Sequence, residues 1–100
     1  MVEIQHRIRR LVARAGETFT VGGNPRKALI GIVPPSVAAR YAPQASVDAA
    51  TRPILLFVVP DDDSTVATDT LVFDGRSLAV LKIVRRTFRG SLACKFILAH

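Results

Sequence analysis

The residues that could do chemistry are few, and their spacing fits no catalytic pattern. Asp61, Asp62 and Asp63 form the only acidic cluster, but it lacks the spaced ligands and distal glutamate of a calcium loop. A solvated turn that keeps an apolar strand soluble is the favoured interpretation. His6 and His100 stand at opposite ends of the sequence without a paired cysteine, so we predict no zinc site. We therefore expect no enzyme activity, no metal and no cofactor.

The basic residues are the more prominent charged feature. Fourteen Lys and Arg against eight Asp and Glu give a net charge of +6, which suits contact with nucleic acid or with an acidic protein, and equally a solvated surface. Two groups stand out: Arg7, Arg10 and Arg14, and Arg85, Arg86 and Arg89. The second group is the candidate DNA-facing set, because its guanidinium groups can contact phosphates. Among the aromatic residues of the strands and their turns, only Phe88 is expected to point outward, so we predict no sequence-specific reading of bases.

The first group lies on an expected amphipathic helix over residues 1–16. At 100° per residue, one face carries Ile4, Ile8, Leu11, Val12 and Ala15. The opposite face carries Glu3, His6, Arg7, Arg10 and Arg14. Gly16 suits the left-handed position that follows a helix, and is the expected stop.

Residues 17–53 predict a hairpin followed by an irregular segment. The expected arms are Thr18–Val21 and Lys27–Val33, joined by the turn GGNPR. Pro34 to Pro53 is rich in proline and small residues, and there we expect one helical turn capped by Ser36. Tyr41 in this segment is a candidate interface residue, with packing at the edge of the core as the alternative.

The remaining sequence predicts further strands. The run ILLFVV, residues 54–59, lacks polar residues and is expected to be a central strand buried on both faces. Asp74-Gly75 is typical of a type I′ turn between Leu71–Phe73 and Ser77–Val84. A turn near Gly90 leads to a last arm over Leu92–Leu98, in which Cys94 is expected to be a small core residue.

Together these elements predict one mainly β domain over residues 1–100. We expect a small antiparallel β-barrel or sandwich of five to seven strands (17–100), with the amphipathic helix (1–16) packed on one side. The longest apolar run is too short to span a bilayer, and the first residues do not have the pattern of a secretory leader, so we expect no membrane association. The predicted core is Ile4, Ile8, Leu11, Leu29, Ile30, Leu55, Phe57, Val72, Leu78, Val80, Phe96 and Leu98.

One pattern extends beyond general layout. It consists of Asp69, Leu71, Gly75, Arg76 and Val80, which fit D-x-L-x-x-x-G-R-x-x-x-V. This segment resembles the C-terminal half of the small head-to-tail connector proteins of tailed bacteriophages. The resemblance covers about the last 40 residues and extends to the preceding segments only in their general order.

The resemblance implies a structural protein of the virion neck, of the head-completion or stopper class, assembled in the host cytoplasm. Such a protein forms a homo-oligomeric ring, six- or twelve-fold, that joins the portal or adaptor protein to tail proteins and seals the DNA channel. A tail-terminator or minor tail protein is an alternative within the virion. A cellular nucleic-acid-binding β-barrel module is the alternative outside it, and non-specific contact with DNA is compatible with both.

A closed ring repeats one contact between two different patches. We expect the segment Pro34 to Pro53 and the acidic residues 61–63 to form such patches, with arginines of the facing subunit opposite the carboxylates. We expect Arg7, Arg10 and Arg14 to meet carboxylates of a partner protein outside the channel, because a basic stripe in the channel would hold DNA phosphates. A helix that lines the channel as a DNA brake is the alternative.

Overall fold

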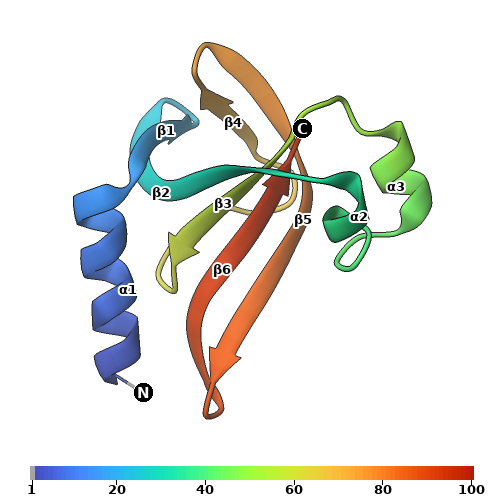
Figure 1. Cartoon of the computed structure of the whole chain (residues 1–100). Helices are drawn as coiled ribbons and strands as arrows, with labels where there is room; N and C mark the ends of the chain where they lie inside the picture. The colour runs from blue at the N-terminus through green and yellow to red at the C-terminus, as the bar shows by residue number, and fades with distance from the viewer. Residues whose placement is uncertain (1) are drawn as a thin grey trace.

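The computed structural model describes residues 2–100, with side chains from Ile4 onward. Its strands close into an antiparallel barrel in the order β1-β2-β3-β6-β5-β4, and an N-terminal helix lies beside it (Figure 1). The predicted mainly β barrel with an N-terminal helix is confirmed. The helix extends over Val2–Ala15 as α1 and contacts β2, β3 and β6 from outside the barrel.

The two faces of α1 divide largely as predicted. Val12 is buried, Ile4 and Ile8 are half-buried, and His6, Arg10 and Arg14 are exposed. Leu11 is 52% exposed, so its placement in the core was wrong; it lies at the border of the apolar face. The predicted position of Glu3 falls outside the described side chains.

Gly16 ends α1 for a steric reason rather than through a left-handed backbone. Its N–H donates to the Val12 carbonyl at 2.8 Å, and its φ does not lie in the positive range. A Cβ at this position would come within 2.3 Å of the Val12 oxygen. A side chain therefore could not fit where the chain turns from the helix into the barrel.

Three hairpins share the same two-residue turn. β1 (Glu17–Val21) and β2 (Asn24–Val33) are joined by Gly22-Gly23, with φ of 58° and 81°. The predicted linker GGNPR was too long, because Asn24 already pairs with Val21. Positive φ at both turn residues matches the twist of the two strands, which explains why the pairing can continue up to the turn.

The C-terminal hairpins repeat this geometry. β4 (Thr70–Phe73) and β5 (Arg76–Phe88) are joined through Asp74-Gly75, with φ of 52° and 75°, as predicted for a type I′ turn. β6 (Ser91–Ala99) follows β5 after Arg89-Gly90, with φ of 52° and 81°. Both β5 and β6 are longer than predicted, since polar and basic residues near Gly90 continue the strands.

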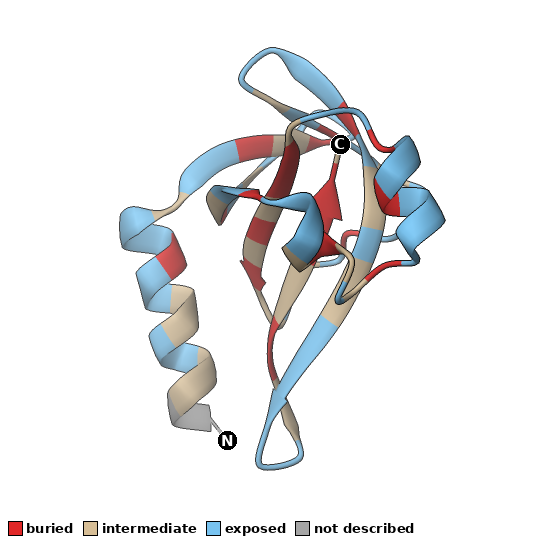
Figure 2. Ribbon diagram, turned by 45° about the vertical axis from the view of Figure 1, so that its right-hand side comes forward, coloured by how far each residue is buried: buried red, intermediate tan, exposed pale blue. Residues whose placement is uncertain are grey.

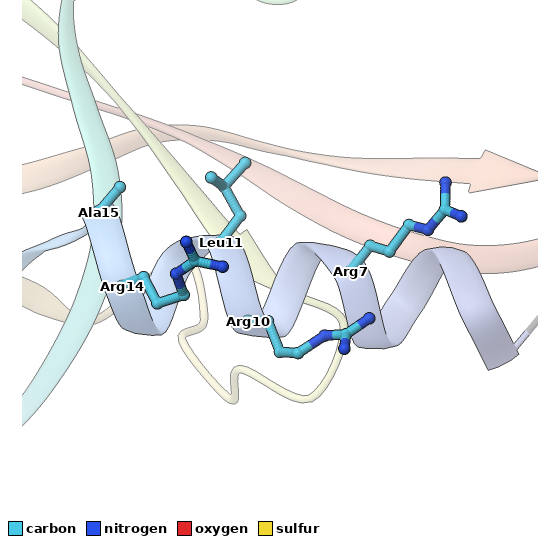
Figure 3. Close-up of a pocket in the computed structure, with 5 residues that line it drawn as sticks. All are labelled: Arg7, Arg10, Leu11, Arg14 and Ala15. Atoms are coloured by element: carbon cyan, nitrogen blue, oxygen red, sulfur yellow. The ribbon is translucent and has the colours of Figure 1, made fainter.

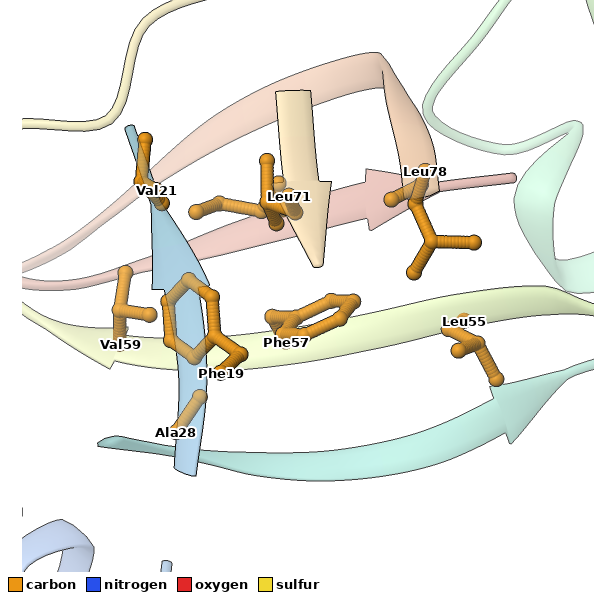
Figure 4. Close-up of a cluster of buried hydrophobic side chains, with 10 residues drawn as sticks. Phe19, Val21, Ala28, Leu55, Phe57, Val59, Leu71 and Leu78 are labelled. Atoms are coloured by element: carbon orange, nitrogen blue, oxygen red, sulfur yellow. The ribbon is translucent and has the colours of Figure 1, made fainter. Parts of the chain in front are cut away.

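The barrel is filled by side chains from all six strands (Figure 4). Phe57 lies at the centre, with ring centroids 5.1 Å from Phe19 and 6.0 Å from Phe73 in edge-to-face contact. The buried members of this cluster are Phe19, Val21, Ala28, Leu55, Phe57, Val59, Leu71, Leu78, Ile97 and Ala99. The barrel therefore has a packed core rather than an internal ligand cavity.

A second apolar cluster lies on the outer side of β3 (Ile54–Pro60) and β6. It is formed with α2 (Pro35–Ala38) and α3 (Gln44–Ala49). Figure 2, which colours the ribbon by burial, shows buried positions in red on the strands and on the short helices. The predicted cap at Ser36 was wrong, because α2 starts after Pro34 and has no side-chain cap, and α3 was not predicted. The buried residues of the cluster are Val33, Ala38, Ala42, Val47, Ala50, Ile54 and Leu98.

This second cluster explains why the run ILLFVV needs no polar face. Leu55 and Phe57 point into the barrel, whereas Ile54 is buried under the short helices. Leu56 and Val58 are half-buried on the outer side. The pairing with β2 and β6 confirms that the run is a central strand, but its predicted burial on both faces holds fully only for the inner face.

The remaining core predictions divide by strand face. Leu55, Phe57, Leu78, Leu98 and Cys94 are buried as predicted. Val72 is exposed, which was wrong, because its neighbour Leu71 takes the inward position of β4. The other predicted members are half-buried: Ile4, Ile8, Leu29, Ile30, Val80 and Phe96.

Candidate interaction surfaces

The first charged surface is the basic stripe on α1, formed by Arg7, Arg10, Leu11 and Arg14 (Figure 3). Spacings of three and four residues place these side chains on neighbouring turns of one helix face. Together with Ala15 they line a shallow hollow. An exposed leucine among three guanidinium groups makes this stripe suitable for an acidic partner that also presents apolar groups.

The acidic turn, residues 61–63, is held by the rest of the chain. Arg9 forms a bidentate pair with Asp61, at 3.0 Å from Nε to Oδ1 and 2.9 Å from Nη2 to Oδ2. The hydrogen bond to Asp61 raises the pKa of Arg9, partial burial opposes the rise, and the negative charges of Asp61 and Asp62 add to it. This pair fixes α1 to the end of β3.

Asp63 makes the second internal connection. Its Oδ1 accepts from Arg26 Nη1 at 3.3 Å and from the Thr65 backbone N–H at 2.9 Å. Lys95 Nζ donates to the Asp63 carbonyl at 2.5 Å. The Asp63 side chain is only 6% exposed, whereas that of Asp62 is 66% exposed. Asp62 is thus the most exposed of the three carboxylates, although its Oδ2 also lies 4.0 Å from Arg9 Nε. An intermolecular role for residues 61–63 stays a prediction.

Sequence reasoning missed Arg9 and Arg26 as the partners of these carboxylates. Arg9 lies three residues before the buried Val12, on the helix face that turns toward the barrel. That spacing could have separated Arg9 from Arg10 and Arg14. No comparable signal marks Arg26, because its contact with Asp63 spans 37 residues.

The third charged surface is the arm, residues 85–90 at the end of the β5–β6 hairpin, which projects beyond the barrel (Figure 1). All six arm residues are exposed, including the three predicted DNA-facing arginines. Arg86 stacks over Phe96 at 5.6 Å and Arg89 over Phe88 at 5.4 Å. No Asp or Glu occurs after Asp74. The arm is therefore a basic projection with an exposed aromatic residue at its end.

Sequence reasoning also missed an apolar surface, the seam hollow. Pairing of β1 with β2 stops at Ala28, so Leu29–Val33 of β2 are paired only with β3. The resulting hollow of about 320 Å³ has an apolar lining and a charged rim. Ile30, Ile32, Pro53, Leu55 and Phe73 form the lining, and Glu17, Asp74 and Arg76 form the rim. Its size is at the lower limit for small-molecule pockets, and it suits one or two protruding side chains.

The other predicted site residues are spread apart. Tyr41 is half-buried against the second cluster, which is the core-edge role; an interface role stays a prediction. His100 Nδ1 accepts from the Thr51 N–H at 3.0 Å, and His6 is exposed on α1. Burial raises the pKa of the Cys94 thiol, while Arg86 opposes this rise and Asp61 adds to it.

The described residues contain no group of three or more His, Cys, Asp or Glu side chains placed to hold a metal ion. Among the helices of residues 2–100, none is long and apolar enough to cross a membrane. Comparison with protein-family models, curated proteins and solved structures finds no match for this chain. Functional inference therefore rests on the chain's own surfaces and on the segment from Asp69 to Val80.

Proposed function

We propose that this chain is a structural component of a tailed-phage virion neck, a homo-oligomeric ring that joins the head to the tail and seals the DNA channel. Its partners would be further copies of itself, the portal or adaptor protein, and tail proteins. The observation that carries the proposal is the combination of the segment from Asp69 to Val80 with a small, fully packed barrel.

Four of the five residues of that pattern support the β4–β5 hairpin. Asp69 Oδ2 accepts from the Val66 N–H at 2.9 Å, just before β4 begins. Leu71 is buried, and Gly75 supplies a positive φ of 75°. Val80 packs against the barrel core. The pattern thus specifies a rigid hairpin, which is what a structural ring subunit requires.

The packed interior favours a role in assembly. Phe19, Phe57, Leu71, Leu78 and Ile97 are at most 1% exposed, so the barrel leaves no space for a small ligand. The charged projections and open hollows described above are surfaces that suit contact with other macromolecules.

The test is deletion of this gene from the phage or prophage that carries it, followed by electron microscopy of the lysate. We expect DNA-filled heads and complete tails that remain separate, with joining restored by the gene supplied in trans. Tails of uncontrolled length would instead indicate a tail terminator. Normal virions after deletion, or a genome without capsid genes, would contradict the proposal.

The arm supports the second candidate, a cellular nucleic-acid-binding module. Arg85, Arg86 and Arg89 can contact phosphates, and the half-exposed ring of Phe88, on which Arg89 also stacks, could stack on a base. Gel-shift assays with short DNA at near-physiological salt separate the candidates. Sub-micromolar affinity with a steep salt dependence favours the binding module, whereas weak binding is expected of a neck protein.

A further inference from the structure

Two surfaces of this chain are complementary but lie at different ends of β5. The seam hollow is apolar with a rim that carries two carboxylates and one guanidinium group, and the arm presents Phe88 among arginines. We infer that the arm of one copy docks into the seam hollow of the next copy, so that the chain associates head to tail. This inference rests on the self-association in the proposed function and assigns it a surface.

The seam hollow has the properties of a surface that is covered in an assembly. The β2 segment from Leu29 to Val33 has one side without a strand partner, and its five residues, LIGIV, include no charge and no proline. Proteins normally protect such edges with charges, prolines or bulges. Ile32 is 74% exposed at this edge. An apolar partner would remove this side chain from water.

The arm has the matching properties. Phe88 is 45% exposed next to the turn, where an aromatic ring can enter an apolar hollow. Arg85 and Arg89 flank it and would lie near the rim carboxylates of Glu17 and Asp74. Arg76 is the one cation on this rim, so the rim carries a net negative charge. This charge pattern favours a basic occupant over an acidic one.

The positions of the two surfaces favour a contact between copies. β5 has 13 residues and begins with Arg76 at the seam hollow and ends with Phe88 in the arm. At about 3.3 Å per residue this strand spans roughly 40 Å, close to the longest dimension of the molecule, 38 Å. The arm therefore cannot reach the hollow of its own chain. A contact between two different patches is heterologous and generates rings or filaments.

The experiment uses two variants that each disable one surface. Ile32→Lys places a charge in the seam hollow, and Phe88→Ser removes the aromatic ring from the arm. Both positions are exposed, so the fold is expected to be retained, which thermal unfolding will verify. Val66→Ser is the matched control, because Val66 is also exposed, at 53%, but lies outside the arm and the lining of the hollow.

Sedimentation velocity over a range of protein concentrations measures the outcome. The original chain and Val66→Ser should form species larger than dimers, and Ile32→Lys and Phe88→Ser should each be monomeric. An equimolar mixture of the two monomeric variants should give dimers and nothing larger. Ile32→Lys retains an arm and Phe88→Ser retains a hollow, so only one junction can form between them.

Other outcomes would overturn the inference. These are a monomeric original chain at all concentrations, assembly of either single variant, or a mixture that yields no dimer. If unjoined heads and tails still follow deletion of the gene, the neck function stands and another surface forms the ring. If the chain forms open filaments that both variants abolish, the arm contact is supported and the closed ring is contradicted.

Discussion

The acidic turn and the arm are both short charged segments between strands, but they differ in where their opposite charges lie. In the acidic turn, Asp61 pairs with Arg9 and Asp63 with Arg26, and Asp62 Oδ2 lies 4.0 Å from Arg9 Nε, so each carboxylate has an arginine of the same chain nearby. In the arm, Arg86 and Arg89 stack on aromatic rings. The turn holds α1 to the barrel and links the end of β3 to β2, whereas the arm projects from the barrel.

The difference shows that a cluster of like charges in a sequence does not define a binding surface. What matters is whether opposite charges of the same chain can reach it. The helix α1 and strand β2 bring one arginine each to the acidic turn. No acidic residue follows Asp74, so neither strand of the arm hairpin supplies a carboxylate. Stability is therefore expected to depend on the turn, and association on the arm.

The largest expected effect on stability is that of Asp63→Ala. This change leaves the buried Thr65 N–H without its acceptor and removes the carboxylate partner of Arg26, which keeps only its bonds to the Thr65 and Ser64 hydroxyl groups. The loss should cost about 1–3 kcal/mol of unfolding free energy. Asp62→Ala is the matched control, and at an exposed position it should change stability by less than about 0.5 kcal/mol. Urea denaturation measures both. Equal effects of the two substitutions would remove the distinction between internal and external carboxylates.

The arm should show a smaller effect on stability. Replacing Arg85, Arg86 and Arg89 by Gln removes two exposed cation–π contacts, each worth about 0.5–1 kcal/mol. The change also removes the repulsion between Arg85 and Lys95, which are directly opposed across the strands. We expect a net loss below about 1 kcal/mol in urea denaturation. A larger loss would mean that the arm, like the acidic turn, contributes to the fold.

Replacing Arg85, Arg86 and Arg89 by Gln also tests whether the arm or the basic stripe on α1 contacts DNA. Each arginine that binds a DNA phosphate contributes about 0.9 to the slope of log affinity against log salt, so its replacement should reduce the slope by that amount. Arg7→Gln, Arg10→Gln and Arg14→Gln in one chain provide the equal-charge control. A greater decrease for the stripe than for the arm, measured by fluorescence anisotropy, would assign DNA contact to α1.

The smallest expected effect is on the alkylation rate of Cys94, because the pKa of its thiol depends on Asp61 in the acidic turn and on Arg86 in the arm. Burial raises this pKa, Arg86 lowers it, and Asp61 raises it. Arg86→Gln should therefore slow alkylation of the folded protein at a given pH, and Asp61→Asn should accelerate it. The pKa of this thiol is higher in the folded protein than in the unfolded chain. The thiol therefore lowers the free energy of unfolding only as pH rises above about 8.5, where the unfolded thiol ionises. Opposite shifts in the alkylation rate would contradict this electrostatic assignment.

The sequence predicts local features well because turns and periodicity depend on nearby residues. Asp74-Gly75 identified a hairpin, and the spacing of Ile8 and Val12 identified the buried side of α1. The mainly β fold was predicted from the number of expected strands and the single long helix before them. The short helices α2 and α3 were harder to predict, since the small residues there gain stability from packing against Ile54 and Leu98 rather than from helix propensity.

Of the candidate surfaces, the sequence could predict only those made of adjacent residues. The arm consists of adjacent residues, so its charge is visible in the sequence. The seam hollow combines β2, β4 and β5 with Pro53, and it exists because β1 begins opposite Ala28 whereas β2 continues to Val33. Likewise, the contact between Arg26 and Asp63 depends on the register in which β2 pairs with β3. Features formed by distant strands need the register of the sheet, which local patterns do not determine.

Hydrogen exchange at increasing protein concentration tests most directly whether the arm acts between molecules and the acidic turn within one. Peptides covering residues 29–33 and 85–90 should gain protection as the chain assembles. The peptide covering residues 61–65 should exchange equally at all concentrations. Protection that increases with concentration at residues 61–65, but not in the arm or at the β2 edge, would contradict the account.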